Sequence, residues 1–158
     1  MIRAAVHADA AAVMELVRGL ADFEHQLDAV EMTEPMLAAA LFGPKPVAEC
    51  TVAEVDGEVV GFALWYVTFS TWTGLPGLWL EDLFVRPQAR GRGLGAALLR
   101  ELASVCLARG YARFEWWVLD WNEAAHGFYR SLGAHPEDEW TVWRVDGPEL
   151  QALGLSST

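Results

Sequence analysis

Apolar residues recur every three to four positions near the start of the chain, which is the spacing of an amphipathic helix. The stripe consists of Val13, Leu16, Val17 and Leu20. It predicts a helix over Asp9–Leu20. A second, short helix is expected to begin after Thr33, whose side chain suits an N-cap, and to end at Gly43. The polar residues between the two helices indicate a loop.

The pattern then changes to runs that are rich in β-branched and aromatic residues. Val47–Val55 and Glu58–Ser70 are separated by Asp56-Gly57, a pair that favours the positive φ angles of a tight hairpin turn. These two strands are therefore expected to be antiparallel neighbours. A loop is expected over TWTGLPG, and a third strand over Leu78–Val85, which a proline follows closely.

Helix and strand patterns alternate in the second half of the chain. We expect a helix over Gly93–Arg109 with Gly110 as the residue that ends it, and a strand over Arg113–Leu119. A helix from Asn122 to about Leu132 and a last strand over Thr141–Val145 are expected to follow. This order predicts a crossover between parallel strands, whereas the first half predicts antiparallel ones. The expected fold is α/β, a mixed and mostly antiparallel sheet with helices on both faces, in a single domain over residues 1–158.

The composition is that of a globular domain with a hydrophobic core. Of the 158 residues, 53% are apolar and 21% are charged. The 22 acidic residues outnumber the 11 Lys and Arg, which gives a net charge of −11. A nucleic-acid binder needs clustered cations, so the charge argues against that class and favours a small cationic partner. Acidity is also an ordinary aid to solubility.

Cysteine usage and hydropathy indicate a cytoplasmic protein. Cys50 and Cys106 lie far apart and form no Cys-x-x-Cys pair, which is typical of reduced thiols and not of a disulfide framework or a zinc site. Charged residues interrupt the N-terminus before any long apolar run, so no signal peptide is expected. The longest strongly apolar stretch, Val59–Val67, is far shorter than the roughly 20 residues of a membrane-spanning helix.

The most informative segment is Arg90–Ala96 (RGRGLGA), which directly follows a predicted strand and opens a helix. Its glycines expose backbone N–H groups at a helix N-terminus, and its arginines reverse the local sign of charge, which favours a phosphate site over a flexible turn. A Walker loop is excluded, because it needs a lysine and the only lysine is Lys45. A dinucleotide fingerprint, with Glu115 at the ribose, is rejected because only one strand–helix–strand unit follows.

Two segments carry a resemblance to a known family. LEDLFVRPQARGRGLG (Leu80–Gly95) and WNEAAHGFYRSLGA (Trp121–Ala134) resemble the GNAT N-acetyltransferases, and within them the spermidine/spermine, or diamine, N-acetyltransferase branch. ADFE (Ala21–Glu24) and VVGFALWYVTFSTW (Val59–Trp72) fit the same branch, so the resemblance covers nearly the whole chain. It implies the GNAT (acyl-CoA N-acyltransferase) fold, in which a parallel pair of strands splays apart.

The resemblance also implies acetyl-CoA as cosubstrate and assigns residues to it. The pyrophosphate would be bound by Arg90, Gly91, Arg92, Gly93, Leu94, Gly95 and Ala96. The pantetheine amides would pair with the backbone of Leu83, Phe84 and Val85, whose N–H groups also suit a thioester oxygen. Asn122 would contact CoA in addition to its local role as a helix N-cap.

Two residues are implied as catalytic. Tyr129 matches the tyrosine that protonates the leaving thiolate, although a half-buried aromatic of a helix face is the plainer interpretation. Glu81 would deprotonate the acceptor ammonium, directly or through water. Asp82 follows it on the same strand, so the two side chains are expected on opposite faces. Asp82 either binds the cationic substrate or fixes a neighbouring loop.

The same resemblance places acceptor-binding residues in two further segments. Phe23 and Glu24 match positions near the polyamine, as does Glu139 or its neighbour Asp138. Without the resemblance, these acids would be interpreted as a solvated surface. The family branch can also have an acidic residue where this chain has Ser70. Trp72 and Trp79 are expected to flank the acceptor loop.

Together these features predict an enzyme that moves acetyl from acetyl-CoA to a primary amine of a small cationic acceptor, by direct transfer in a ternary complex. A di- or polyamine is the first expectation. A thialysine-like or other small amine, or a CoA-binding sensor without catalysis, is the alternative. No metal, nucleic acid or membrane is expected as a partner, and the resemblance implies a homodimer.

Overall fold

The computed structural model describes residues 1–155. The chain separates into two compact units, Met1–Leu119 and the residues from Asp120 onward. The expectation of a single domain over residues 1–158 stays a prediction.

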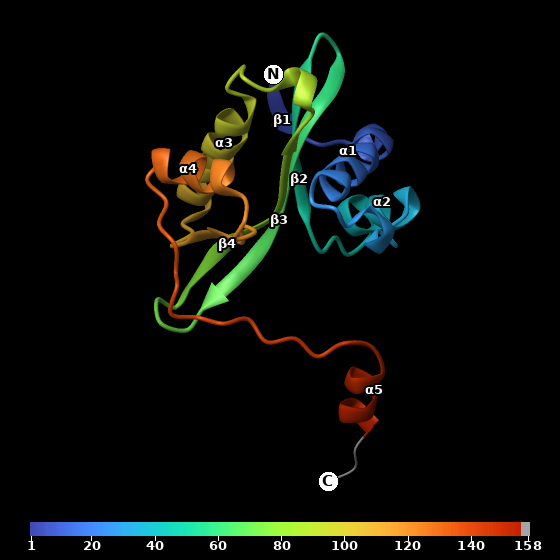
Figure 1. Cartoon of the computed structure of the whole chain (residues 1–158), viewed down its shortest axis with the longest axis vertical. Helices are drawn as coiled ribbons and strands as arrows, with labels where there is room; N and C mark the ends of the chain where they lie inside the picture. The colour runs from blue at the N-terminus through green and yellow to red at the C-terminus, as the bar shows by residue number, and fades with distance from the viewer. Residues whose placement is uncertain (156–158) are drawn as a thin grey trace. The chain divides into compact units, whose positions relative to one another are not determined.

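The first unit is built on a five-stranded mixed sheet (Figure 1). In their spatial order the strands are β1 (Ile2–Ala4), β2 (Glu49–Val55), β3 (Glu58–Ser70), β4 (Leu75–Val85) and β5 (Phe114–Trp116). The first four are antiparallel to their neighbours, and β5 is parallel to β4. The mixed sheet with one parallel pair is therefore confirmed. The sequence pattern missed β1, which is too short to show an alternation.

The two hairpins of the sheet differ in how well they were predicted. Asp56 and Gly57 join β2 to β3 with φ angles of 53° and 81°, as the tight turn requires. The expected loop after β3 is shorter than predicted, because Leu75–Gly77 extends β4 and pairs with the end of β3. A Cβ at Gly77 would come within 2.9 Å of Thr68 Oγ1, so this glycine serves a close approach of two strands.

Helices cover both faces of the sheet, as predicted (Figure 1). The helices of the first unit are α1 (Ala10–Phe23), α2 (Glu34–Phe42) and α3 (Leu94–Arg109), with short 3-10 turns at His7–Asp9, Leu27–Ala29 and Pro87–Ala89. On the face under α1 and α2, the core contains Val13, Leu16, Leu37, Val52, Phe62 and Phe84. On the opposite face, α3 contributes the buried Leu98 and Leu102. The predicted caps are present, since Met36 N–H donates to Thr33 Oγ1 at 3.4 Å and Gly110 has a φ of 69°.

The second unit contains α4 (Glu123–Ser131) and α5 (Gly147–Leu155) in its described part. The prediction of a strand over Thr141–Val145 is wrong, because this segment has no regular structure and its Trp143 is 92% exposed. A strand needs a partner edge for its backbone groups, and residues 120–155 contain no other strand that could supply one. Helix α5 was not predicted.

Neither cysteine is part of a disulfide. Cys50 and Cys106 are both buried thiols, and burial raises the pKa of Cys50 to about 12. Within residues 1–155, no helix combines the length and the apolar character that crossing a membrane would require.

Candidate active site

The glycine-rich turn forms an open backbone cradle at the start of α3. Gly91 and Gly93 both have a φ of 75°, a conformation that side chains with a Cβ rarely adopt. A Cβ built at either glycine meets no atom of the described chain within 4 Å, so the space beside them is open. Gly93 is the N-cap of α3, and no described side chain caps the helix. The first N–H groups of α3 thus suit an anionic group such as pyrophosphate.

The pairing of β4 with β5 ends at Leu80, the last residue of β4 that pairs with β5 in the described chain. Arg86 N–H, just after β4, donates to Val60 O of β3 at 2.8 Å, so the backbone groups of Arg86 face β3. Because these groups alternate along an antiparallel pair, Leu83 and Val85 direct their N–H and C=O groups away from β3. The second half of β4 is therefore not paired with β5 in the described chain, and its outward backbone groups suit the amides of an extended ligand. The splay itself stays a prediction.

The Arg90 guanidinium lies between two phenyl rings. Its central carbon is 5.3 Å from the ring centroid of Phe23, at the end of α1, and 5.4 Å from that of Phe84. Arg90 Nε also donates to Val85 O at 2.9 Å. Cation–π contacts of this kind hold a guanidinium in place when it is partly desolvated. The structure therefore brings Phe23, predicted for the acceptor, against Arg90 and Phe84, predicted for the cosubstrate.

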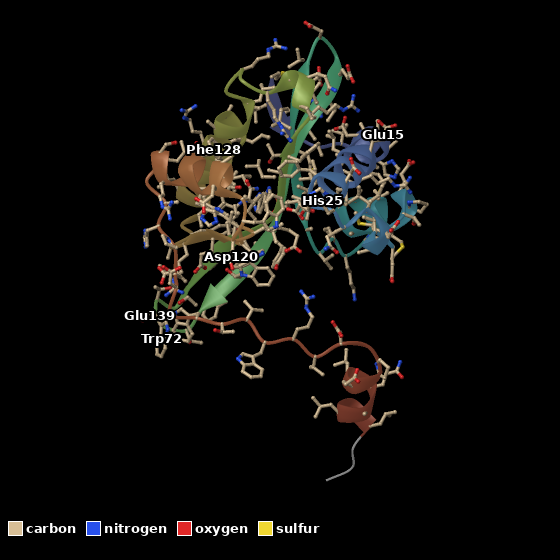
Figure 2. The ribbon with its side chains drawn as sticks, in the orientation of Figure 1. Glu15, His25, Trp72, Asp120, Phe128 and Glu139 are labelled. Atoms are coloured by element: carbon tan, nitrogen blue, oxygen red, sulfur yellow. The ribbon has the colours of Figure 1, made fainter. Side chains whose placement is uncertain are left out.

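A cavity of about 500 Å³ adjoins this contact, between α1 and the end of β4. Its wall includes Phe23, Phe84 and Arg90, together with Asp22 and Arg86. The Arg86 guanidinium is held by two carboxylates, at 3.1 Å by Glu15, which Figure 2 marks on α1, and by Glu58. Arg86 thus organises the wall through ion pairs within the protein.

A β-bulge at Glu81 changes the expected geometry of the two adjacent acids. The residues on either side of Glu81 pair with consecutive positions of β3, so Glu81 has no cross-strand partner among the described residues. Asp82 lies opposite Leu64, which packs against the core under α1. Trp79, three residues before Asp82, is on the same face, and its Nε1 donates to Glu81 Oε2 at 3.2 Å. The prediction of opposite faces is wrong, because the extra residue interrupts the alternation.

Two neighbouring carboxylates influence Asp82. Burial, followed by the negative charges of Glu81 and Glu24, raises the pKa of Asp82 to about 6. Glu24 is the C-cap of α1, and burial raises its pKa as well. All the influences on Asp82 disfavour its charged form, so a cationic ligand would relieve them. Among the described residues, no group of three or more acidic, His or Cys side chains is arranged to hold a metal ion.

Sequence reasoning missed Tyr66. It lies directly opposite Trp79 on β3, half-buried; burial, the charge of Glu81 and a hydrogen bond to the Glu81 carboxylate raise the pKa of Tyr66. Knowledge of the strand register would have found it. Trp72 does not flank this site: it is 81% exposed at the β3–β4 turn, and Figure 2 shows it well apart from His25 at the end of α1.

The remaining predicted residues belong to the second unit. Asn122 Oδ1 accepts from Ala125 N–H at 3.2 Å, which confirms Asn122 as the N-cap of α4. Tyr129 lies two turns further along α4, with its ring tilted against that of Phe128 at 5.2 Å. Glu139 is exposed in a turn after α4 (Figure 2). The roles of Asn122, Tyr129 and Glu139 toward a ligand stay predictions.

The sequence and the structure were compared with those of known proteins. Residues 13–134 match the acetyltransferase (GNAT) family. The chain is 37% identical to a thialysine N-epsilon-acetyltransferase of Sus scrofa, with 97% of this chain and 96% of that protein covered. It is 34% identical to a spermidine/spermine N(1)-acetyltransferase-like protein 1 of Homo sapiens, with 94% of this chain and 23% of that protein covered. An integron cassette protein from the mobile metagenome of V. cholerae has a similar structure, with a TM-score of 0.83, 25% identity and coverage of 99% and 98%.

The chain therefore belongs to the GNAT acetyltransferase family. The fold expected from the sequence is confirmed by this membership and by the five-stranded mixed sheet. An acetyltransferase is an enzyme of acyl transfer. This chemistry gives the glycine turn, the second half of β4 and the carboxylates their candidate roles.

Proposed function

We propose that the protein transfers an acetyl group from acetyl-CoA to a primary amine of a small cationic acceptor, most simply a di- or polyamine, by direct transfer in a ternary complex. The observation that carries this proposal is the second half of β4. Carboxylates stand at one end of it, and an anion cradle follows the other. The strand rise puts these ends roughly 13 Å apart, with backbone groups of β4 that face away from β3 between them.

The glycine turn is proposed to bind the pyrophosphate of CoA. Gly91 and Gly93 open the backbone, and the first N–H groups of α3 point at the phosphate oxygens. The outward N–H and C=O groups of Leu83 and the N–H group of Val85 would pair with the amides of the pantetheine arm, while Val85 O accepts from Arg90 Nε. A backbone N–H on this edge also suits the thioester oxygen, where negative charge develops as the amine attacks.

Glu81 is proposed as the base. An ammonium cannot attack a carbonyl carbon, so a proton must leave the acceptor nitrogen before the new C–N bond forms. The Glu81 side chain is exposed at the bulge, and its carboxylate can take this proton directly or through one water. Asp82 and Glu24 would then hold the remaining positive charge of a diamine, because burial disfavours the charged form of both acids and the charges of Glu81 and Glu24 add to this at Asp82.

Tyr129 is proposed as the acid that protonates the CoA thiolate as the C–S bond breaks. Its support is the match to the family motif and its place on α4, two turns after the capping Asn122. Tyr129→Phe should lower kcat by about 100-fold and leave the affinity for acetyl-CoA within about threefold. Tyr111→Phe is the matched control, since its hydroxyl contacts Arg109 at the end of α3. Wild-type turnover in Tyr129→Phe would remove Tyr129 from this role.

The decisive experiment is an acetylation screen with purified protein, acetyl-CoA and a panel of polyamines, lysine analogues and aminoglycosides. Release of free CoA thiol, which depends on the amine, is the readout. Turnover of at least one cationic amine is the expected result. Tight CoA binding with no turnover of any amine would favour a CoA sensor and overturn the proposal of an enzyme.

A thialysine-like amino acid is the second candidate acceptor. The observation that favours it is the 37% identity, over nearly the whole chain, to a protein named for that substrate. The two candidates differ in one carboxylate, so the sharpest comparison is thialysine against the diamine that lacks its carboxyl group. We expect a higher kcat/KM for the diamine, because Glu24 and Asp82 would repel the carboxylate of thialysine. A preference for thialysine would reverse this assignment and leave the acetyltransferase proposal intact.

A homodimer is proposed as the working form. Exposed apolar side chains gather in the segment after α4, among them Trp140, Val142 and Trp143. Contiguous exposed apolar surface of this kind is typical of an interface. Light scattering of the full chain should give twice the monomer mass, and Trp143→Glu should shift it toward the monomer. A monomeric wild type at micromolar concentration would contradict the proposal.

A further inference from the structure

The Glu81 carboxylate meets hydrogen-bond donors from two adjacent strands. Trp79 Nε1 donates to Glu81 Oε2 at 3.2 Å from within β4. The Tyr66 hydroxyl reaches the same carboxylate from β3, where Tyr66 lies directly opposite Trp79. The bulge is what makes this convergence possible, because it turns Glu81 toward the face that Tyr66 and Trp79 share.

The donors are themselves held in place. The Trp79 indole packs edge-on against Trp117, which follows β5, with ring centroids 5.0 Å apart and an interplanar angle of 81°. Tyr66 is half-buried in the middle of β3, the longest strand of the sheet. Both donors thus come from packed aromatic rings on the sheet, which keep their positions better than loop side chains do.

An exposed glutamate is ordinarily mobile. Its terminal torsion is broad, and fixing a long side chain in one orientation costs conformational entropy. A base that must meet an ammonium in one orientation works faster when this freedom has already been removed. A carboxylate has about four acceptor sites, so two donors fix it and still leave sites for the incoming proton.

We propose that Tyr66 and Trp79 are positioning residues that fix the Glu81 carboxylate for proton transfer from the acceptor amine. This proposal rests on the proposed function of Glu81. Neither aromatic residue exchanges a proton with the substrate. Their effect on the reaction passes through Glu81.

A double-mutant cycle tests this dependence. Tyr66→Phe keeps the ring and should lower kcat about 10-fold, the equivalent of one hydrogen bond to a charged group, with KM for acetyl-CoA unchanged. In a Glu81→Gln background the same substitution should change kcat less than about twofold, because no base is left to position. Tyr111→Phe serves as the control for a hydroxyl removed elsewhere. Additive losses in the double variant, or full activity of Tyr66→Phe, would overturn the proposal.

A spectroscopic readout separates this proposal from the proposed function. The chain has three tyrosines, so Cζ-labelled tyrosine gives three NMR resonances, and Tyr66→Phe identifies one of them. The Tyr66 resonance should titrate above the ordinary tyrosine range in the wild type and move back toward it in Glu81→Gln, while that of Tyr111 stays in place. A Tyr66 resonance that ignores Glu81→Gln would refute the contact, whether or not the enzyme acetylates any amine.

A second variant covers the case in which Tyr66→Phe does not fold. Trp79→Phe removes the indole donor and keeps an aromatic ring against Trp117. It should show the same loss of kcat, and the loss should again disappear in the Glu81→Gln background. A loss that persists in that background would mean that Trp79 acts through packing alone, and would overturn its positioning role. If the wild type acetylates no amine, the proposed function fails, and the NMR titration still decides the contact.

Discussion

The two ends of the second half of β4 are proposed to recognise opposite charges, and they differ in the groups that would do so. At Glu81 and Asp82, the charge resides in side chains that a bulge turns to one face, close to Glu24. At Gly91 and Gly93, the attraction for an anion comes from backbone N–H groups at the start of α3. In a chain with a net charge of −11, the proposed anion site would thus depend on glycine conformation and the proposed cation site on carboxylates.

This difference predicts which substitutions each end tolerates. A carboxylate site loses its function when one oxygen is replaced by an amide nitrogen, even though the fold is unchanged. A backbone site is insensitive to side-chain chemistry but depends on positive φ angles that only glycine adopts at little cost. Substitutions that change only the carboxylate chemistry, or only the backbone conformation, therefore test the two proposed sites separately.

The largest effect is expected at the acid end. Glu81→Gln removes the proposed base without changing its size, and should lower kcat by about 100- to 1,000-fold in steady-state assays of amine-dependent CoA release. Glu101→Gln, on the exposed side of α3, is the matched control. The KM for acetyl-CoA should stay within about twofold. A kcat within threefold of wild type would exclude Glu81 as the base.

The next largest effect is expected at Asp82, which should make the free energy of unfolding depend on pH. Its pKa of about 6 in the folded protein lies above the ordinary value of 3.8, so between these pH values the folded state holds a proton that the unfolded chain has already lost. The contribution of Asp82 to folding should therefore fall by about 3 kcal/mol as the pH rises from about 4 to 6 and level off above. Urea unfolding between pH 4 and 7.5 measures this.

The matched variants for that series are Asp82→Asn and Asp28→Asn. Asp82→Asn should be the more stable protein above pH 6 and should remove most of the slope, since an amide stays neutral. Asp28 is exposed, and Asp28→Asn should follow the wild-type curve. Parallel curves for the wild type and Asp82→Asn would show that Asp82 is not the group that titrates.

The anion end should respond to backbone strain at one glycine and not at another. Gly93→Ala and Gly110→Ala both place a Cβ at a positive φ, at the two ends of α3, and each should cost about 1–2 kcal/mol of stability. Gly93→Ala should also weaken CoA binding about 10-fold in calorimetry, because its Cβ enters the space reserved for the phosphate. Equal CoA affinity in the two variants would argue against the cradle.

Asn122 gives the smallest effect and a test of its two roles. Asn122→Ala should lose about 1 kcal/mol of stability in thermal unfolding, since it removes the N-cap of α4. Asn122→Asp keeps a capping oxygen and should retain that stability. If the amide also contacts CoA, Asn122→Asp should still bind CoA several-fold more weakly. Unchanged CoA binding in Asn122→Asp would reduce Asn122 to a structural cap.

Local patterns predicted most of the elements for reasons that lie within a few residues. The Thr33 cap, the Asp56-Gly57 turn and Gly110 after α3 depend on nearby backbone conformation, and each is present. The prediction of a strand over Thr141–Val145 is wrong. Residues that favour strands show that a segment is able to pair, but they do not show that it meets the edge of another strand. The loop expected over Leu75–Gly77 is wrong as well. Proline and glycine are unfavourable in most strands, but here the end of β3 pairs with this segment and accommodates both residues.

For this protein, the sequence by itself determined the anion cradle, because positive φ angles and a helix N-terminus are local properties that RGRGLGA encodes directly. It also determined the family, through motifs that the comparison confirms. The tertiary structure alone decided that Glu81 and Asp82 share a face and that Tyr66 meets Glu81. A bulge shifts the register between two strands, and register is set by cross-strand packing, which no short stretch of sequence contains.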